Sequence, residues 1–391
     1  MEEMTRKILL SAIILLSAVI CSGQKSRVLS VFQLIESKKY KEAKEAIELA
    51  IWNDRTSRWP RTFFAKGLLC QTAFEEGFEK NDTEKTELYP DQLYLAYAAY
   101  ERALKLDKRE RLHSAVAARY YKLSNDFQKL GKRHFERREY AEAMKAFEHA
   151  LLVGQSPLLS VKADTGLIYN TAIAAYESKN WEKAIGYLTG LNSDSYSPEV
   201  ALLLYHSHMG NGDSAAAVEI LVDGVDRYGS NEDIVLRLVE LYVRQGQQPS
   251  AIALLDTAAS RQPGNHVFPW TTGQIYQRME RYQEAIESYT RAIALEPSQV
   301  DLYYNLGICY YNMGVEINES ARKIRNQSMY REARSEAREK FTESVKWLEK
   351  AYELDPGEQK TISRLYQLYY QLQMDEKRKT MEMLMRRQGT I

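Results

Sequence analysis

The 391 residues carry 53 basic and 53 acidic side chains, and 45% of the residues are hydrophobic. This is the composition of an ordinary folded protein, and a formal net charge of zero argues against a nucleic-acid partner, which normally requires a basic excess. Nine prolines and 19 glycines are few for this length and favour helices, whereas 27 tyrosines leave aromatic surface to spare for a partner.

Residues 1–23 are predicted to be an export signal peptide. Two basic residues precede an apolar run from residue 8 to residue 20. This run is shorter than the ~20 residues of a membrane span but suits the core of a signal peptide. We expect cleavage after Gly23 and a mature protein that begins at Gln24 in the periplasm. Two alternatives stay open, namely a lipid on Cys21 and an uncleaved membrane anchor.

A period of 34 residues runs through the middle of the chain. Ala217, Ala251 and Ala285 follow one another at this interval, and so do Gly273 and Gly307. A fixed period of this length indicates a stack of helical hairpins, in which small residues let the two helices approach closely. Other residues recur at the same interval, namely Ala258 with Ala292, Pro263 with Pro297, and Tyr242, Tyr276 and Tyr310.

One period, from residue 232 to residue 265, predicts a complete hairpin. Its first half places apolar residues at i, i+3, i+4 and i+7 from Val235, which is the pattern of one helical face. Gly246 and Pro249 then mark a turn, and a second apolar face follows from Ala251. The segment therefore reads as helix, turn and helix.

Particular residues recur at set places in these hairpins. The first helix carries Leu306-Gly307 followed by Tyr310, and the second opens with Tyr282-Gln283-Glu284-Ala285 and closes with Ala292 and Pro297. This pattern resembles the tetratricopeptide repeat family. The resemblance implies an all-α fold, a right-handed superhelical solenoid of about nine hairpins. It also implies a binding groove on the concave side, lined by the first helix of each hairpin.

The spacing predicts five segments. They are a signal peptide at 1–23, irregular N-terminal hairpins at 24–123, a regular array at 124–314, a long-helix insert at 315–357 that completes a hairpin, and a C-terminal capping repeat at 358–391. Only Cys70 and Cys309 follow the signal peptide. About six repeats separate them, so we expect no disulfide.

Two inserts interrupt the period. The acidic insert 78–91 predicts a solvated loop, with a contact for a basic partner as the alternative. Residues 315–340 contain no glycine or proline and predict helix. Shared between both helices of a hairpin, the extra residues would lengthen each by ~18 Å. Such a projection could either dock a partner or be a surface elaboration.

No pattern in the chain indicates catalysis, a metal site or a cofactor. His206 and His208 are two residues apart and would face away from each other on a helix. Phosphate-loop, zinc-protease and nucleophile-elbow motifs are missing from the sequence. A catalytic site in the inserts is disfavoured because the inserts contain no histidine or cysteine.

The resemblance places a partner-binding groove on the first helices. Transferred to matching positions, its lining comprises Tyr169, Asn170, Tyr176, His206, Glu240, Trp270, Gln274, Tyr304, Asn305 and Tyr311. Aromatic and amide side chains together suit an extended peptide or a protein loop. We therefore expect an exported, non-enzymatic scaffold for a protein or peptide partner in envelope assembly or secretion. The alternative is a glycan-binding module of an outer-membrane uptake system, and the sequence does not indicate an oligomeric state.

Overall fold

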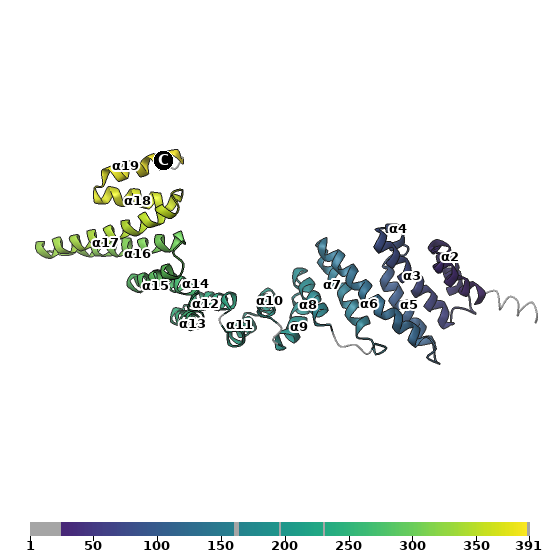
Figure 1. Ribbon diagram of the computed structural model, residues 1–391. Helices are drawn as coiled ribbons and strands as arrows, with labels where there is room; N and C mark the ends of the chain where they lie inside the picture. Colours follow the sequence, from purple (N-terminus) through teal and green to yellow (C-terminus); the bar gives the residue numbers. More distant parts are fainter. Residues whose placement is uncertain (1–24, 160–163, 195–196, 230, 389–391) are drawn as a thin grey trace, which may run out of the picture. The chain divides into compact units, whose positions relative to one another are not determined.

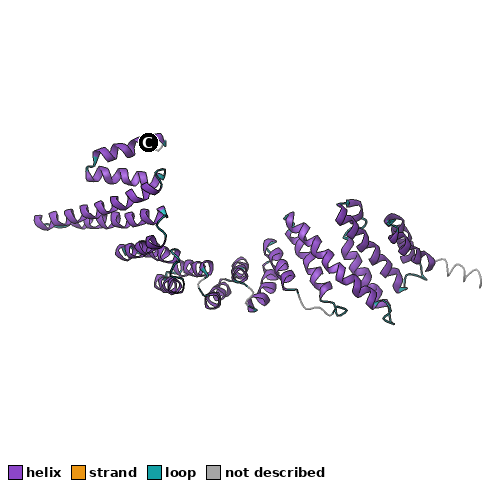
Figure 2. Cartoon of the chain, viewed as in Figure 1, coloured by secondary structure: helices purple, strands orange, loops and turns teal. Residues whose placement is uncertain are grey.

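The computed structural model describes residues 25–159, 164–194, 197–229 and 231–388, and their regular structure is entirely helical (Figures 1 and 2). Within these ranges the helices pair into nine successive hairpins. The all-α prediction and the expected number of hairpins are therefore confirmed. The predicted signal peptide, its cleavage point and Cys21 lie outside the described residues. In the part of the chain that is described, no helix is long and apolar enough to cross a membrane.

The chain divides into two units. The first runs to residue 196 and takes in His206–Asp213, and the second holds Ser197–Tyr205 and everything from Ser214 onward. The helices of the first unit are residues 25–36, α2 (Tyr40–Ile51), α3 (Pro60–Lys80), α4 (Thr83–Thr86), α5 (Gln92–Leu106), α6 (His113–Glu136), α7 (Tyr140–Gly154), α8 (Thr165–Glu177) and α9 (Trp181–Ser193).

Helix α10 (Pro198–Gly210) contributes to both units. The helices that follow in the second unit are α11 (Ser214–Tyr228), α12 (Glu232–Arg244), α13 (Gln248–Arg261), α14 (Val267–Arg278), α15 (Tyr282–Leu295), α16 (Val300–Ala321), α17 (Gln327–Leu354), α18 (Gln359–Leu372) and α19 (Asp375–Arg387).

The small residues of the period lie where the helices of a hairpin meet. A Cβ atom on Gly273 would lie 2.7 Å from Cε1 of Tyr289, and one on Gly131 would lie 2.6 Å from the ring of Phe147. Ala285 is fully buried in the apolar cluster between α15 and α16. The first helix therefore packs directly onto an aromatic ring of the second, and a side chain larger than hydrogen at the glycine would not fit.

The turn between the two helices of a hairpin requires one residue in the left-handed region. Gly246 has φ 72° in the turn that the sequence predicts, and Glu280 has φ 60° one repeat later. In the later turn the amide of Glu280 donates to Gln277 and that of Arg281 donates to Tyr276, at 3.1 and 2.9 Å. These two bonds satisfy carbonyls that the helix end leaves open.

The acidic insert 78–91 is not the solvated loop that its composition predicts. Its first residues extend α3, four more form α4, and the side chains of Leu88 and Tyr89 are buried. The hydroxyl of Tyr89 donates to Glu48 on α2 at 2.8 Å. The insert folds back onto the first hairpin because its apolar centre is buried there.

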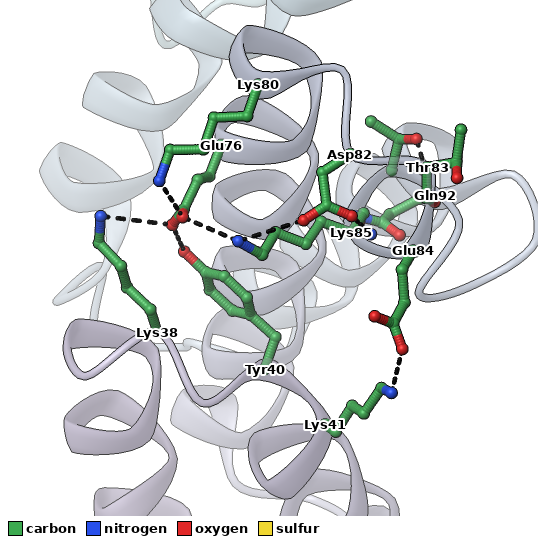
Figure 3. A network of polar contacts seen from close by, with 11 residues as sticks. Lys38, Tyr40, Lys41, Glu76, Lys80, Asp82, Thr83, Glu84, Lys85 and Gln92 are labelled. Carbon is green, nitrogen blue, oxygen red and sulfur yellow. Dashed lines mark hydrogen bonds and ion pairs between the residues drawn. The ribbon is translucent and has the colours of Figure 1, made fainter.

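The carboxylates around the insert pair with lysines of the same chain (Figure 3). Glu76 accepts from Lys80 and Lys85, both at 2.9 Å, and from the hydroxyl of Tyr40 at 2.7 Å. These hydrogen bonds, that of Lys80 first, hold the pKa of Glu76 well below its usual range. Within the insert, Asp82, Glu84 and Asp91 also pair with lysines of this chain, which disfavours the contact for an outside basic partner.

Helix α6 begins at His113, earlier than the boundary at residue 124 that the period indicates. Val116, Tyr120 and Leu123 are fully buried, so the apolar face of the helix continues through this stretch. Residues 113–123 therefore belong to the same helix as the first predicted regular repeat.

The insert after Gly314 lengthens both helices of its hairpin, as the sequence predicts. Helix α16 has 22 residues and α17 has 28, whereas α14 and α15 of the preceding hairpin have 12 and 14. Figure 1 shows the two long helices lying against each other. Their contact includes Gly314, whose Cβ would meet the ring of Phe341 at 2.7 Å.

Cys70 and Cys309, the two cysteines among the described residues, are buried and free. Cys70 lies in the first unit and Cys309 in the second. The expectation that they do not form a disulfide is confirmed. Burial raises the pKa of both thiols to about 12, which leaves them protonated and unreactive at neutral pH.

Candidate functional site

A shallow pocket of about 290 Å³ lies between α14 and α16, and polar side chains surround it. We call it the amide pocket. Its residues are Gln274, Gln277 and Arg278 on α14, Tyr289 on α15, and Asn305 and Asn312 on α16. The two predicted groove residues Gln274 and Asn305 thus come together, from the first helices of neighbouring hairpins.

The amides of this pocket differ in how far the protein satisfies them. Gln277 accepts a hydrogen bond from the hydroxyl of Tyr289 at 2.7 Å, which fixes its side chain. The half-buried side chains of Gln274 and Asn305 have no hydrogen-bond partner in the ranges that the structure covers. An amide offers both a donor and an acceptor, which is what an extended peptide backbone also presents.

The amide pocket carries a positive charge. Arg278 forms no ion pair with any described residue, and it is exposed at the pocket. The pKa of the Tyr289 hydroxyl is raised above its usual range by burial, so this group stays neutral. The pocket therefore combines one uncompensated guanidinium with four neutral amides and suits a polar or acidic ligand.

Tyr304 and Tyr311 are half-buried, and each contacts a cation from α18. The Nζ of Lys360 lies 4.7 Å from the ring centroid of Tyr304, and the guanidinium of Arg364 lies 4.5 Å from that of Tyr311. Tyr311 also contacts the buried ring of Phe341, at 5.8 Å between centroids. One face of each ring is thus covered by the protein itself.

Trp270 is only half-exposed and contributes to packing. Its ring lies against the apolar cluster of α15 and α16 and stacks on His266 at 6.4 Å between centroids. Its indole Nε1 is buried and has no hydrogen-bond partner in the described chain. Substitution of Trp270 would therefore disturb the fold as well as any groove.

Glu240 is already paired within its own helix. Its carboxylate lies 3.0 Å from Nη1 of Arg237 and 2.5 Å from Nη2 of Arg244. The charge that the sequence offers to a partner at this position is thus largely neutralised.

The remaining predicted residues lie in the first unit. Asn170 borders a hollow of about 470 Å³ between α6 and α8, with Lys129, Lys132 and the ring of Phe147. Tyr176 packs edge-on against Trp181, at 5.6 Å between centroids, and Tyr169 and His206 are half-buried. The first unit thus has a separate surface, which shares no residue with the amide pocket.

Four residues of the amide pocket, Gln277, Arg278, Tyr289 and Asn312, are missing from the sequence-based set. Gln277 and Arg278 follow Gln274 at i+3 and i+4, and Asn312 follows Asn305 at i+7. Residues at these spacings share a helical face. Helical spacing from the two predicted amides would have found Gln277, Arg278 and Asn312, whereas Tyr289 lies on the second helix of its hairpin, α15.

Models of the tetratricopeptide repeat match residues 208–267 and 273–314, and the second range contains all six residues of the amide pocket. These two stretches of the chain are similar to tetratricopeptide repeats. Five of the six pocket residues lie on α14 and α16, the first helices of two neighbouring hairpins, and Tyr289 lies on α15. No curated protein matches the sequence significantly.

Solved structures with similar folds share little sequence with this chain. A TPR repeats protein from Bacteroides fragilis NCTC 9343 is 17% identical, with 63% of this chain and 98% of that one covered and a TM-score of 0.34. MamA from Desulfovibrio magneticus RS-1 is 15% identical, with 49% and 92% covered and a TM-score of 0.35. Both TM-scores lie below 0.5, so these likenesses carry no information about this chain's site.

Proposed function

We propose that the protein is a non-enzymatic scaffold that holds an extended segment of a partner protein in the amide pocket. Arrays of tetratricopeptide repeats generally mediate contacts between proteins. The observation that carries the proposal is the pair of half-buried amides, Gln274 and Asn305, without hydrogen-bond partners in the described chain. Each amide leaves a donor and an acceptor open, so a ligand backbone that pairs with both would gain affinity.

The charge of the pocket indicates which segment fits best. Arg278 is the charged residue of the lining, and Arg364, which forms no ion pair with any described residue, lies on α18 near Tyr311. Lys360, near Tyr304, is already paired with Asp301 and Glu358. An acidic side chain or a C-terminal carboxylate would complement the two unpaired arginines. We therefore expect the bound segment to be polar and to carry at least one negative charge.

A peptide library tests the proposal without knowledge of the natural partner. Twelve-residue peptides displayed on phage are selected on the full chain and then measured against variants. The groove variant is Gln274→Ala with Asn305→Ala, and the matched control is Gln283→Ala with Thr290→Ala on the exposed face of α15. Selected peptides should lose at least ~10-fold in affinity for the groove variant, because two interfacial hydrogen bonds are lost. If the selected peptides bind the groove variant and the control variant with equal affinity, the proposal is wrong.

The alternative of a glycan-binding module lacks a supporting observation. Glycan binding would use the open faces of Trp270, Tyr304 and Tyr311, but each ring already has a face against His266, Lys360 or Arg364. The amide pocket is lined mainly by amides and not by open rings. We therefore favour a peptide ligand over a sugar.

We further propose that the scaffold works outside the cytoplasm, in the cell envelope. The support is the apolar run from residue 8 to residue 20, with Gly23 placed as a cleavage position. Sequencing the N-terminus of the native protein should find Gln24. An intact Met1 would instead favour an uncleaved anchor, and a lipid on Cys21 would show attachment to a membrane.

A further inference from the structure

One end of the first unit exposes apolar and basic side chains together. We call it the basic edge and define it as residue 25 with residues 49–61 and 105–111. Trp52 is 84% exposed and Leu49 is 59% exposed, and they lie three residues apart at the end of α2. Exposed side chains of this size on neighbouring positions leave apolar area in water.

Contacts show that the parts of the basic edge lie together. The Nζ of Lys25 lies 5.6 Å from the ring centroid of Trp59, and the guanidinium of Arg61 lies 6.0 Å from the same ring. Near the end of α5, the guanidinium of Arg102 lies 4.4 Å from the ring of Phe63 at the start of α3. The loop after α5 therefore lies at the same end of the unit as the loop before α3 (Figure 1).

The basic edge is strongly positive in a chain whose formal net charge is zero. It holds eight lysines and arginines and three carboxylates. One of these carboxylates, Asp107, is buried and accepts the backbone amide of Leu112 at 2.6 Å. Seven of the cations are exposed and form no ion pair with any described residue, namely Lys25, Arg58, Arg61, Lys105, Lys108, Arg109 and Arg111.

The opposite end of the same hairpins is different. There Lys38, Lys80 and Lys85 are all paired with Glu76 (Figure 3). Lysines of the first unit are thus neutralised at one end and left open at the other. Because of this asymmetry, a negatively charged surface would attract the end of the unit that carries the unpaired cations.

We propose that the basic edge rests on the surface of a lipid bilayer that contains anionic headgroups. Tryptophan prefers the boundary between headgroups and acyl chains, and clustered cations are attracted to anionic lipid. An acidic protein or a nucleic acid could also use these groups, but the chain itself favours the bilayer. Trp52 and Leu49 place exposed apolar side chains beside these cations, and the boundary between headgroups and acyl chains takes up apolar and cationic groups together.

The test uses the full chain and its own tryptophans on vesicles with about 30% phosphatidylglycerol in phosphatidylcholine. Acyl chains brominated near the headgroup should quench tryptophan emission. Trp52→Phe should remove most of this quenching, because Trp52 is the most exposed of the large apolar residues and lies on the edge. The control Trp181→Phe alters a ring packed against Tyr176 and should leave the quenching unchanged.

A second pair of variants tests the charge. Lys108→Glu, Arg109→Glu and Arg111→Glu together should abolish the Trp52 quenching on anionic vesicles. The matched control reverses three exposed cations of the second unit, Arg322, Lys323 and Arg325, and should retain it. Quenching that Trp52→Phe does not reduce would overturn the proposal. So would equal effects of the two charge reversals, or failure of the full chain to bind these vesicles. Far-ultraviolet circular dichroism verifies that each variant is folded.

Discussion

Glycines beneath aromatic rings decide how closely the two helices of a hairpin approach. At Gly273 a methyl group would overlap the buried ring of Tyr289, with 2.7 Å between carbon atoms. Gly186, in the interior of α9, has no heavy atom within 4 Å of an added Cβ. Glycine is therefore required at position 273 for steric reasons, whereas position 186 has room for a larger side chain.

This contrast predicts opposite effects of the same substitution. Gly273→Ala should lower the free energy of unfolding by about 1–3 kcal/mol, because the hairpin must open to admit the methyl group. Gly186→Ala should raise it by about 0.5–1 kcal/mol, because alanine restricts the unfolded chain more than glycine does. Chemical denaturation measures both values. Stabilisation by both variants would show that Tyr289 does not constrain the helices.

A buried carboxyl in the first unit makes stability depend on pH. Asp126 is 3% exposed and accepts from Nε2 of Gln71 at 3.0 Å, and the nearest cation, Nζ of Lys129, is 3.8 Å away. Burial, with the nearby carboxylate of Glu75, raises the pKa of Asp126 to about 7. The protonated form is therefore favoured in the folded state. Its stabilisation is complete below the ordinary pKa of 3.8 and is lost as the pH rises towards 7.

Asp126→Asn should remove this pH dependence. Asparagine keeps an acceptor for Gln71 and adds a donor for Glu75, whose Oε1 is buried without a hydrogen-bond partner in the described chain. Thermal melts should show the variant with a higher Tm than wild type at pH 8 and with a similar Tm near pH 4. Parallel curves for the two proteins would contradict the assignment. Glu76→Gln is the contrasting control, because the pKa of Glu76 is lowered and its charged form stabilises the fold at neutral pH.

At the scale of helices and turns, consecutive repeats use different residues for the same backbone task. Gly246 and Glu280 occupy equivalent turns with φ of 72° and 60°. Glycine adopts this conformation without steric cost, whereas for other residues it costs about 1 kcal/mol or more in free energy. The turn at Glu280 is thus a site where the repeat stores strain.

Exchanging the two residues should give opposite effects on stability. Glu280→Gly should raise the free energy of unfolding by up to about 1 kcal/mol, and Gly246→Glu should lower it by about as much. Because repeats couple mainly to their neighbours, hydrogen exchange should show each change most strongly in the hairpin that carries it. A loss of protection at the Glu280 variant would show that its turn is not strained.

Helices whose positions follow from the 34-residue period could be predicted from the sequence. Segments whose structure depends on contacts with residues far along the chain could not. The 34-residue spacing of Ala251 and Ala285 was sufficient to place the hairpins, because small residues must stand at every helix contact. The folding of the acidic insert was missed because Tyr89 finds its partner Glu48 on another helix, 41 residues away. No periodic pattern reports such a pairing.

The site was predictable to a similar extent. Family positions indicated Gln274 and Asn305, which do meet at one pocket. They could not indicate that Glu240 is paired with two arginines or that Trp270 is largely packed, because both depend on side-chain geometry across a helix. The groove as a whole therefore stays a prediction, with the amide pocket as its best-defined part.

At the scale of the whole molecule, the central claim is that the first helices of the second unit hold a partner protein. Asn305 borders the amide pocket on α16, whereas Thr290 is exposed on α15 and is not part of the pocket lining. Tyr330 is 39% exposed and lies on α17, the second helix of the long hairpin, so it tests the alternative that the partner docks on the long helices. These three positions distinguish the candidate surfaces of this unit.

The most direct measurement places a photo-reactive phenylalanine analogue at each of the three positions in the native cells. Irradiation should join one discrete protein to the variant at Asn305 and none to the variant at Thr290, because a bound segment lies within reach of the pocket alone. Identical products from Asn305 and Thr290, or a product from Tyr330 only, would contradict a partner site in the amide pocket.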